Sequence, residues 1–357
     1  MRLAILGVGL IGGSVGLAAR ERLGAQVVGY DPDGDAVRTG LAVGALDAPA
    51  EDLAAAVGDA DLVVVCAPVG RIPAVAADAL AAARPDAIVT DVGSAKRDVV
   101  AALPDPRFIA GHPLAGAETA GAAGSRADLF DGAPWYLTPT SATSGVHFER
   151  LTRFVAGIGA RPQAIDAATH DRLMASVSHL PHVIANVMVA QAAQALGGDG
   201  SLPATGPSFR DATRVAGANT TMWTDIYLAN RDALVDQLDD AVARLQDVRA
   251  ALVAQDAGAI ARWNDAARAD REALLQVGLA GGEGPARELR VTVTNRPGIV
   301  AEIALALGRA GININDMTLS PSADRRTGEV ALWVAADRAG RAAELVAGLG
   351  LQIEGEA

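Results

Sequence analysis

A glycine-rich turn between an apolar run and a helical stretch constrains the fold more than any other feature of the sequence. Residues 3–6 are apolar, and Gly7, Gly9 and Gly12 follow with the spacing G-x-G-x-x-G. The first glycine permits a tight turn, the second lets the backbone approach a pyrophosphate, and the third allows the helix to pack closely on the strand. The pyrophosphate would then lie against the N–H groups of the helix N-terminus. The pattern predicts a dinucleotide-binding strand, turn and helix.

An acidic residue lies where this fingerprint requires one. The second apolar run ends in Asp31, about twenty residues after the glycines, where a carboxylate accepts hydrogen bonds from the ribose hydroxyls. Asp31 would repel a 2′-phosphate, which favours NAD over NADP, although Arg38 nearby can weaken the preference. A glycine-rich turn beside a surface aspartate is the alternative. The residues expected to bind NAD are Gly7, Gly9, Leu10, Ile11, Gly12 and Asp31.

Three segments with different periodicities follow one another. In residues 1–165, short apolar runs alternate with alanine-rich helical stretches, which predicts a mostly parallel, doubly wound α/β sheet of the Rossmann type. In residues 166–280 apolar residues recur at helical spacing, so we expect an all-helical domain. Residues 281–285 read as a linker, and residues 286–357 have the order βαββαβ of a small α+β domain.

The individual elements of these domains follow from the same periodicity. The strands expected in the first domain are residues 3–6, 26–30, 62–67, 87–90, 108–110 and 135–138, and the helices are residues 11–22, 35–43 and 72–83. The strands expected in the last domain are residues 288–294, 312–319, 329–335 and 351–353, and the helices are residues 299–310 and 338–348.

Composition and charge exclude several classes of partner. A formal net charge of −12 repels phosphate backbones and anionic membranes, so we expect neither nucleic acid nor a membrane as a partner. The single cysteine, Cys66, reads as a small buried hydrophobe and fits a reducing, cytoplasmic compartment. Residues 1–14 could pass for a signal peptide, but their glycines fall at cofactor-binding spacing. No other uninterrupted apolar stretch reaches the length of a membrane span.

Histidine is scarce, and three of the five histidines lie in two compact motifs. His112 follows an expected strand, whose carboxyl end faces the ligand crevice, so it should point toward the nicotinamide. A histidine suits the base that an alcohol dehydrogenation needs near neutral pH. The second motif, residues 178–182, opens the helical domain with Ser-His-Leu-Pro-His. His147 and His170 read as surface residues.

A third cluster, residues 209–214, supplies two cations. An anionic substrate needs a fixed guanidinium that holds a carboxylate with two hydrogen bonds, and Arg214 can do this. Arg210 and Asp211 can instead form a structural ion pair, and one of His179 and His182 can instead be a helix-packing residue. No metal site is expected, since no Cys, Asp or Glu stands at ligand spacing with these histidines.

Taken together, these motifs resemble the prephenate dehydrogenase family, with an ACT domain at the C-terminus. The matching pieces occur in family order, at residues 7–14, 91–96, 112–118, 178–182, 209–214 and 223–226. The resemblance implies an oxidoreductase of tyrosine biosynthesis that converts prephenate, a dianion, to 4-hydroxyphenylpyruvate with NAD+. It also implies a homodimer, formed through the helical domain, and feedback by tyrosine bound at the ACT domain, with phenylalanine as the alternative effector.

The resemblance also implies roles for single residues. His112 accepts a hydrogen bond from the ring hydroxyl, and Ser94 hydrogen-bonds near both. Arg214 holds a substrate carboxylate. The residues that line the same pocket are Ser178, His179 and His182, while Trp223 and Arg210 shape it across the dimer interface.

Some alternatives stay open on the sequence. Arogenate, with an amino group in place of the side-chain keto group, is the alternative substrate, and Ala117 in the catalytic motif offers no charge that would select it. Glu118 belongs to the motif without a chemical role. Residues 295–298, Asn-Arg-Pro-Gly, are expected to begin a helix of the ACT domain and to let its backbone come close to a ligand. That domain can instead only help dimerisation, and the whole chain can be a non-catalytic, amino-acid-responsive regulator.

Overall fold

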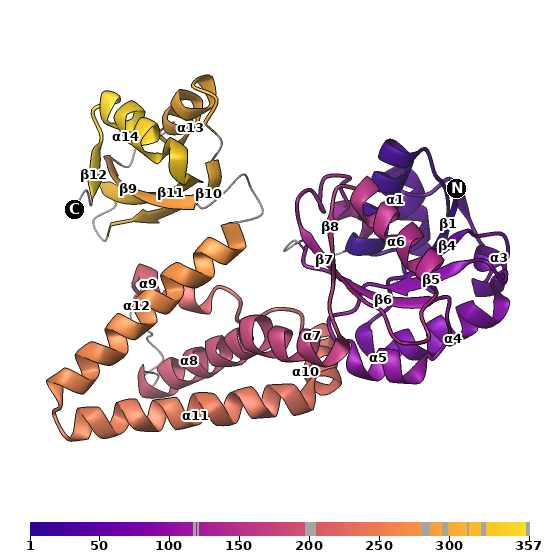
Figure 1. Cartoon of the computed structure of the whole chain (residues 1–357), viewed down its shortest axis with the longest axis horizontal. Helices are drawn as coiled ribbons and strands as arrows, with labels where there is room; N and C mark the ends of the chain where they lie inside the picture. The colour runs from indigo at the N-terminus through magenta and orange to yellow at the C-terminus, as the bar shows by residue number, and fades with distance from the viewer. Residues whose placement is uncertain are drawn as a thin grey trace. The chain divides into compact units, whose positions relative to one another are not determined.

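The protein is described here from a computed structural model, and its chain folds into two compact units. The first unit comprises Met1–Asn186 with Ala216–Ala241, and the second comprises Val187–Val215 with Val242–Ala357. The residues that the structure describes are 1–116, 119, 121–196, 205–279, 286–294, 299–312, 314–322 and 326–354. Figure 1 labels the helices and strands of both units.

An eight-stranded sheet forms the centre of the first unit. Its strands are β1 (Arg2–Leu6), β2 (Gln26–Tyr30), β3 (Ala48–Pro49), β4 (Leu62–Val65), β5 (Ile88–Asp91), β6 (Phe108–Pro113), β7 (Pro134–Thr138) and β8 (Arg161–Ala164). They lie in the order β3-β2-β1-β4-β5-β6-β7-β8, and all neighbours pair in parallel except β6 and β7. Strands β1 to β3 are added toward one edge of the sheet, and β4 to β8 are added toward the other edge. The topological switch point, where such sheets bind ligands, therefore lies between β1 and β4. The predicted doubly wound sheet is confirmed.

Helices cover both faces of this sheet (Figure 1). They are α1 (Leu10–Leu23), α2 (Gly34–Ala42), α3 (Leu53–Val57), α4 (Ile72–Ala82), α5 (Arg97–Ala102) and α6 (Gly145–Gly157), with 3-10 turns η1 (Val69–Arg71) and η2 (Ala122–Gly124). Successive side chains of a strand point to opposite faces. Ile5 therefore packs in one core with residues of α1 and α6, whereas Leu6 packs in the other with residues of α3 and α4.

Two strands and three helices of this unit were not predicted from the apolar pattern. β3 is only two residues long, and β8 at the sheet edge is polar and exposed along half its length, so neither has an apolar run. The helices α3 and α5 span five and six residues and are too short to establish a periodicity, and the longer α6 was also missed.

The described residues between 166 and 279 form helices joined by turns and contain no strand, as predicted. Its elements are α7 (Ala167–Met174), the π turn η3 (Ala175–His179), α8 (Leu180–Leu196), α9 (Pro207–Thr213), α10 (Thr220–Ala229), α11 (Arg231–Val253) and α12 (Ala257–Leu279). The continuous helix from Ala167 to Gln194 is long and apolar enough to cross a membrane by length and composition alone. That criterion is weak, because a core helix of a soluble protein also meets it, and this helix carries the buried charged residue Asp171.

The C-terminal part of the second unit has the predicted βαββαβ order. Its elements are β9 (Ala286–Thr294), α13 (Ile299–Arg309), β10 (Ile314–Pro321), β11 (Thr327–Ala335), the 3-10 turn η4 (Ala336–Arg338), α14 (Ala339–Gly348) and β12 (Gln352–Glu354). The four strands form an antiparallel sheet in the order β10-β11-β9-β12, and Ile303 and Val346 from the two helices are buried in its core. The expected linker, residues 281–285, and the expected ligand turn, residues 295–298, lie outside the described residues.

Candidate active site

The glycine turn between β1 and α1 has the backbone geometry that its spacing predicted. Gly7 has a φ of +104°, and a Cβ there would lie 2.6 Å from the carbonyl oxygen of Cys66. A Cβ on Gly12 would lie 2.1 Å from the carbonyl oxygen of Gly7. Both positions therefore require glycine, the first for its conformation and the second for the close approach of helix and turn. Burial raises the pKa of the Cys66 thiol beside this turn, so the thiol stays protonated.

The residues of this turn fit a bound dinucleotide. A Cβ on Gly9 would meet nothing within 4 Å, so the space beside this glycine is open to a ligand. Gly9 is also the N-cap of α1 without a side-chain cap, and the first turn of α1 carries no acidic residue. The first N–H groups and the positive end of this helix are thus available to a pyrophosphate. Leu10 and Ile11 begin the helix and pack against the sheet core.

Asp31 lies at the end of β2 beside the glycine turn. Its Oδ2 accepts a hydrogen bond from Val8 N at 2.7 Å, and its Oδ1 accepts one from Asp33 N at 2.8 Å. Each carboxylate oxygen can accept a further bond, so ribose hydroxyls can still be held. The fixed negative charge at this place is unfavourable for a 2′-phosphate.

A buried ion pair holds the backbone in front of His112. The side chains of Asp91, at the end of β5, and Lys96 form a salt bridge, and both are completely buried. Asp91 Oδ1 accepts from Gly111 N at 3.0 Å, while Lys96 Nζ donates to Gly111 O at 2.7 Å. The carboxylate also accepts from Gly93 N at 2.8 Å. The pair therefore binds both the N–H and the carbonyl oxygen of Gly111, the residue before His112 in β6.

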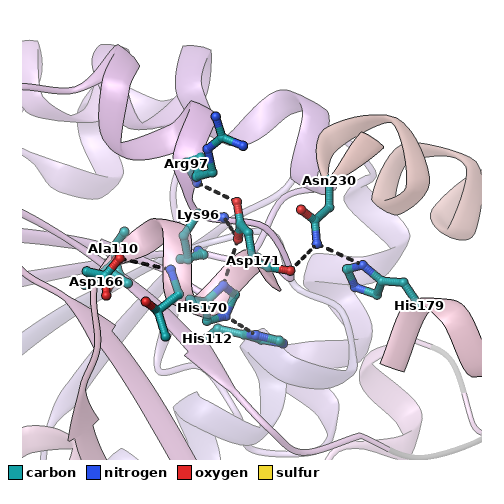
Figure 2. Close-up of polar contacts among 12 residues, drawn as sticks. Lys96, Arg97, Ala110, His112, Asp166, His170, Asp171, His179 and Asn230 are labelled. Carbon is teal, nitrogen blue, oxygen red and sulfur yellow. Dashed lines mark hydrogen bonds and ion pairs between the residues drawn. The ribbon is translucent and has the colours of Figure 1, made fainter. Parts of the chain in front are cut away.

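Two successive hydrogen bonds link the side chain of His112 through His170 to Asp171 (Figure 2). The imidazole Nδ1 of His112 lies 2.9 Å from Nε2 of His170, and Nδ1 of His170 lies 2.8 Å from Oδ1 of Asp171. His170 is 0% exposed, Asp171 is 1% exposed and His112 is 9% exposed. The interpretation of His170 as a surface residue is therefore wrong. The side chain lies on the buried face of α7, behind His112.

Asn230 connects this chain to His179. Its Nδ2 donates to the carbonyl oxygen of Asp171 at 2.8 Å and lies 3.1 Å from Nδ1 of His179 (Figure 2). Since Nδ2 carries only protons, Nδ1 of His179 is the acceptor and its Nε2 carries the proton. His179 is buried, and Asn230 follows α10 in the sequence. The two motifs that were separate in the sequence thus share one hydrogen-bonded network.

The π turn explains how one helix presents both histidines of the second motif. Pro181 lacks an N–H, so a carbonyl of the preceding turn loses its helical partner. The helix widens to a π turn over Ala175–His179, and Nδ1 of His182 lies 3.1 Å from the carbonyl oxygen of Ser178. The ring of His182 stacks on Trp223 with a centroid distance of 3.4 Å, whereas His179 meets the same indole edge-on at 6.1 Å.

The remaining candidate residues lie in two places. Ser94 follows β5 in a bend, at the same carboxyl edge of the sheet as His112, and its side chain has no hydrogen bond within the described part of the chain. Arg214 ends α9 in the second unit and is exposed, and Arg210 of the same helix donates to the carbonyl oxygen of Thr205 at 3.5 Å. The role of Arg214 at the substrate remains a prediction. Ala117 and Glu118 lie outside the described residues.

Four residues of this network had no role in the sequence analysis: Lys96, His170, Asp171 and Asn230. A signal for two of them was present, because His170 and Asp171 precede Met174 and Ala175 by four positions and so share one helix face with them. All four of these residues are buried. No comparable periodicity marks Asn230, which lies between two helices.

Burial controls the charge of the two histidines nearest the centre of the site. It lowers the pKa of His112 well below its ordinary value, and the neighbouring His170, Lys96 and His179 lower it further. Burial also lowers the pKa of His179 to about 4, although the Asp171 carboxylate opposes the shift. Both imidazoles are therefore neutral at physiological pH, which is the form that accepts a proton.

The first prediction concerns stability in mild acid. The unfolded protein binds a proton at each histidine near pH 6.5, whereas folded His179 does so only near pH 4, so the unfolded state binds more protons between these values. Stability should therefore fall as the pH drops from about 6.5 to 4, by about 3 kcal/mol for His179. Urea unfolding across this range measures the slope.

A matched variant tests whether His179 causes this loss. In His179→Asn the amide oxygen can still accept from Asn230, but the side chain no longer titrates. The slope between pH 6.5 and 4 should become shallower in this variant. The lowered pKa values of Asp61 and Asp105 affect stability mainly at the acid end of this window and below it, because their ordinary value is 3.8. An unchanged slope would contradict the assignment to His179.

Three family models match consecutive parts of the chain. The model described as the prephenate dehydrogenase nucleotide-binding domain matches residues 15–164. The model of the prephenate dehydrogenase dimerization domain matches residues 166–265, and the ACT domain model matches residues 287–347. These matches follow the same order as the three periodicities of the sequence.

Known proteins show the same relationship over most of the chain. A prephenate dehydrogenase of Bacillus subtilis is 29% identical over 88% of this chain and 87% of its own length. A cyclohexadienyl dehydrogenase of Zymomonas mobilis is 35% identical over 71% of this chain and 89% of its own. The crystal structure of a prephenate dehydrogenase from Aquifex aeolicus, in complex with hydroxyphenyl propionate and NAD+, aligns with a TM-score of 0.73 at 26% identity. It covers 77% of this chain and 98% of that one.

Proposed function

Because this chain belongs to the prephenate dehydrogenase family, we propose that it catalyses the oxidative decarboxylation of prephenate to 4-hydroxyphenylpyruvate. The resemblance predicted from the motifs is confirmed, and the chain is an NAD-dependent oxidoreductase with a dimerisation domain and an ACT domain. The observation that carries the substrate proposal is the position of His112. This neutral imidazole lies at the carboxyl edge of the sheet whose first strand leads into the glycine turn.

His112 and Ser94 have different roles in the proposed reaction. His112 accepts the proton of the ring hydroxyl as that carbon is oxidised, and Ser94 hydrogen-bonds beside it. When bound, NAD+ supplies the acceptor for the hydride that leaves the same carbon. The ring carboxylate then departs as CO2, and its bonding electrons complete the aromatic ring. Neutral His112 suits this role, since a protonated imidazole could not accept the hydroxyl proton.

Recognition of the substrate rests on the remaining candidates. Arg214 holds a carboxylate of the dianion through two hydrogen bonds, which a guanidinium forms better than an ammonium group. Ser178, His179 and His182 line the pocket from the π turn and the start of α8. The stack of His182 on Trp223 fixes that wall of the pocket. Arogenate stays the alternative substrate.

The same proposal covers the organisation of the protein. The domains extend over residues 1–165, 166–280 and 286–357, and the chain forms a homodimer through its dimerisation domain. Tyrosine binds at the ACT domain as a feedback effector. The enzyme acts in the cytoplasm on a small dianionic substrate.

A paired substrate assay tests the function. Formation of the reduced nicotinamide, NADH or NADPH, is followed with prephenate and with arogenate, each supplied with NAD+ and with NADP+, and each repeated with added tyrosine. We expect turnover of prephenate with NAD+, weaker use of NADP+ because of the Asp31 charge, and inhibition by tyrosine. Good turnover of arogenate without turnover of prephenate would replace the proposed substrate. Turnover of neither would favour a non-catalytic regulator.

A further inference from the structure

We propose that His170 is a positioning residue that fixes the tautomer of His112, so that Nε2 of His112 is always the proton acceptor. This inference rests on the proposed role of His112 as the base. Neither His170 nor Asp171 occurs in the motifs that identified the site, and both belong to α7 rather than to the sheet that carries His112. The proposal follows from counting donors and acceptors along the chain of hydrogen bonds in Figure 2.

The carboxylate of Asp171 accepts hydrogen bonds from two backbone N–H groups. Its Oδ1 accepts from Lys96 N at 2.8 Å, and its Oδ2 accepts from Arg97 N at 2.9 Å. These two N–H groups begin helix α5, which has no cap from its own sequence. Each oxygen of this carboxylate therefore acts as an acceptor for a backbone N–H group. An ionised carboxylate only accepts hydrogen bonds, so Nδ1 of His170, 2.8 Å away, must carry a proton.

The orientation of the next bond follows from this first one. A neutral imidazole carries one proton, so Nε2 of His170 has a lone pair when Nδ1 is protonated. That nitrogen lies 2.9 Å from Nδ1 of His112, which therefore donates. The proton of neutral His112 is thus on Nδ1, and its Nε2 has the lone pair. Within the described residues, Nε2 of His112 has no hydrogen-bond partner and remains available to a substrate hydroxyl.

Packing keeps this chain in one geometry. The rings of His112 and His170 meet edge-on with centroids 5.1 Å apart, and Tyr136 meets His170 edge-on at 5.7 Å. Tyr136 pairs with His112 across β6 and β7, so one strand pair orients both imidazoles. Asn230 holds the main chain of Asp171. Because His170 and Asp171 are buried, water does not compete for their hydrogen bonds.

A His112 without this partner would divide its population between two tautomers. The tautomer with the proton on Nε2 presents a donor to the substrate hydroxyl and is inactive as a base. Losing the orienting hydrogen bond of a catalytic histidine can therefore lower turnover by wrong protonation alone, as in serine proteases. We expect a loss of about 10- to 100-fold in the turnover number, the range found when the outer partners of metal-bound histidines are removed.

Nitrogen NMR of the full-length protein, labelled with 15N-histidine, tests the tautomer directly. The chain has only five histidines, so each resonance pair can be assigned by single replacements. We expect Nδ1 of His112 to carry the proton and Nε2 to show the shift of an unprotonated nitrogen. The measurement needs neither substrate nor cofactor, so it decides the inference even where the proposed reaction fails. A proton on Nε2 of His112 would overturn it.

Two amide variants separate positioning from structure. In His170→Gln the side-chain oxygen can reach the place of Nε2 and accept from His112, whereas in His170→Asn the amide occupies the place of Nδ1 and contacts only Asp171. Both replace a buried ring by an amide, and the two amides differ by one methylene. In His170→Asn we expect the turnover number to fall, His112 to populate both tautomers, and KM to change little. In His170→Gln we expect most of the turnover number and the single His112 tautomer to be retained.

The outcome of this comparison is decisive in either direction. Equal turnover numbers and equal His112 nitrogen shifts in the two variants would show that His170 acts only through packing, and would overturn the proposal. A control outside the network, His147→Asn, should leave turnover and the His112 resonances unchanged, because His147 lies on α6 and its Nδ1 is 3.5 Å from the carbonyl oxygen of Pro106.

Discussion

Replacing His112 with asparagine should lower the turnover number by about 10²- to 10⁴-fold, the range that a positioned general base contributes. The introduced amide can still contact His170 from the place of Nδ1, so the network behind it stays largely intact. The glycine turn and Asp31 are untouched, and NAD+ should bind as in the unchanged enzyme. Steady-state kinetics with prephenate and a direct titration of NAD+ measure the two quantities.

The control for this experiment is a histidine of the same domain outside the network. His147→Asn should change neither the turnover nor the affinity for NAD+, since His147 lies on α6, beside Pro106 and outside the network. Near-normal turnover in His112→Asn would remove His112 from the role of base. A loss of NAD+ binding in the same variant would instead show that the fold of the site had changed.

Replacing Lys96 with methionine should lower the free energy of unfolding by about 3 to 5 kcal/mol, the cost of breaking a buried ion pair by removing one partner. Methionine fills a similar volume, so the loss comes from the Asp91 carboxylate, which is left buried without its cation. Gly111 O also loses its donor. Burial already lowers the pKa of Lys96 against the opposing effect of Asp91, so the ammonium depends on this pair.

Two comparisons make this stability measurement specific. Arg153→Met breaks an exposed i,i+4 pair with Glu149, for which the expected loss is only about 0.5 kcal/mol. The double variant Asp91→Asn/Lys96→Met should recover part of the loss, because no charge is then buried alone. Urea unfolding of the three proteins gives the values. A loss for Lys96→Met no larger than that for Arg153→Met would contradict the role of the buried pair.

Gly111 and His112, two consecutive residues of β6, are held by different side chains. Lys96 and Asp91 hold the backbone at Gly111, whereas His170 holds the ring of His112 that follows it. Gly111 itself has little room, since a Cβ there would lie 2.8 Å from the carbonyl oxygen of Asp91. The position of His112, the proposed base, is therefore set both through its main chain and through its ring. Residues of β5, β6 and α7 all contribute to holding this one histidine.

Much of the architecture could be predicted because it depends on local periodicity. The strand β4 is a completely buried apolar run, and the glycine turn has a spacing that few other structures require. The edge strand β8 was missed because a strand exposed along half its length needs no apolar pattern. The short helix α5 was missed because its cap, Asp171, comes from a helix 74 to 75 residues later in the sequence.

The sequence by itself determined the cofactor turn, the order of the three folds and the identity of His112 as the candidate base. Each of these depends on residues within about one element of one another, where spacing along the chain is spacing in the structure. Only the tertiary structure decided that His170 is buried, that Asp171 caps α5, and that Lys96 clamps Gly111. Those contacts join segments that are far apart in the chain, and the orientation of a hydrogen bond between two imidazoles depends on what each touches on its other side.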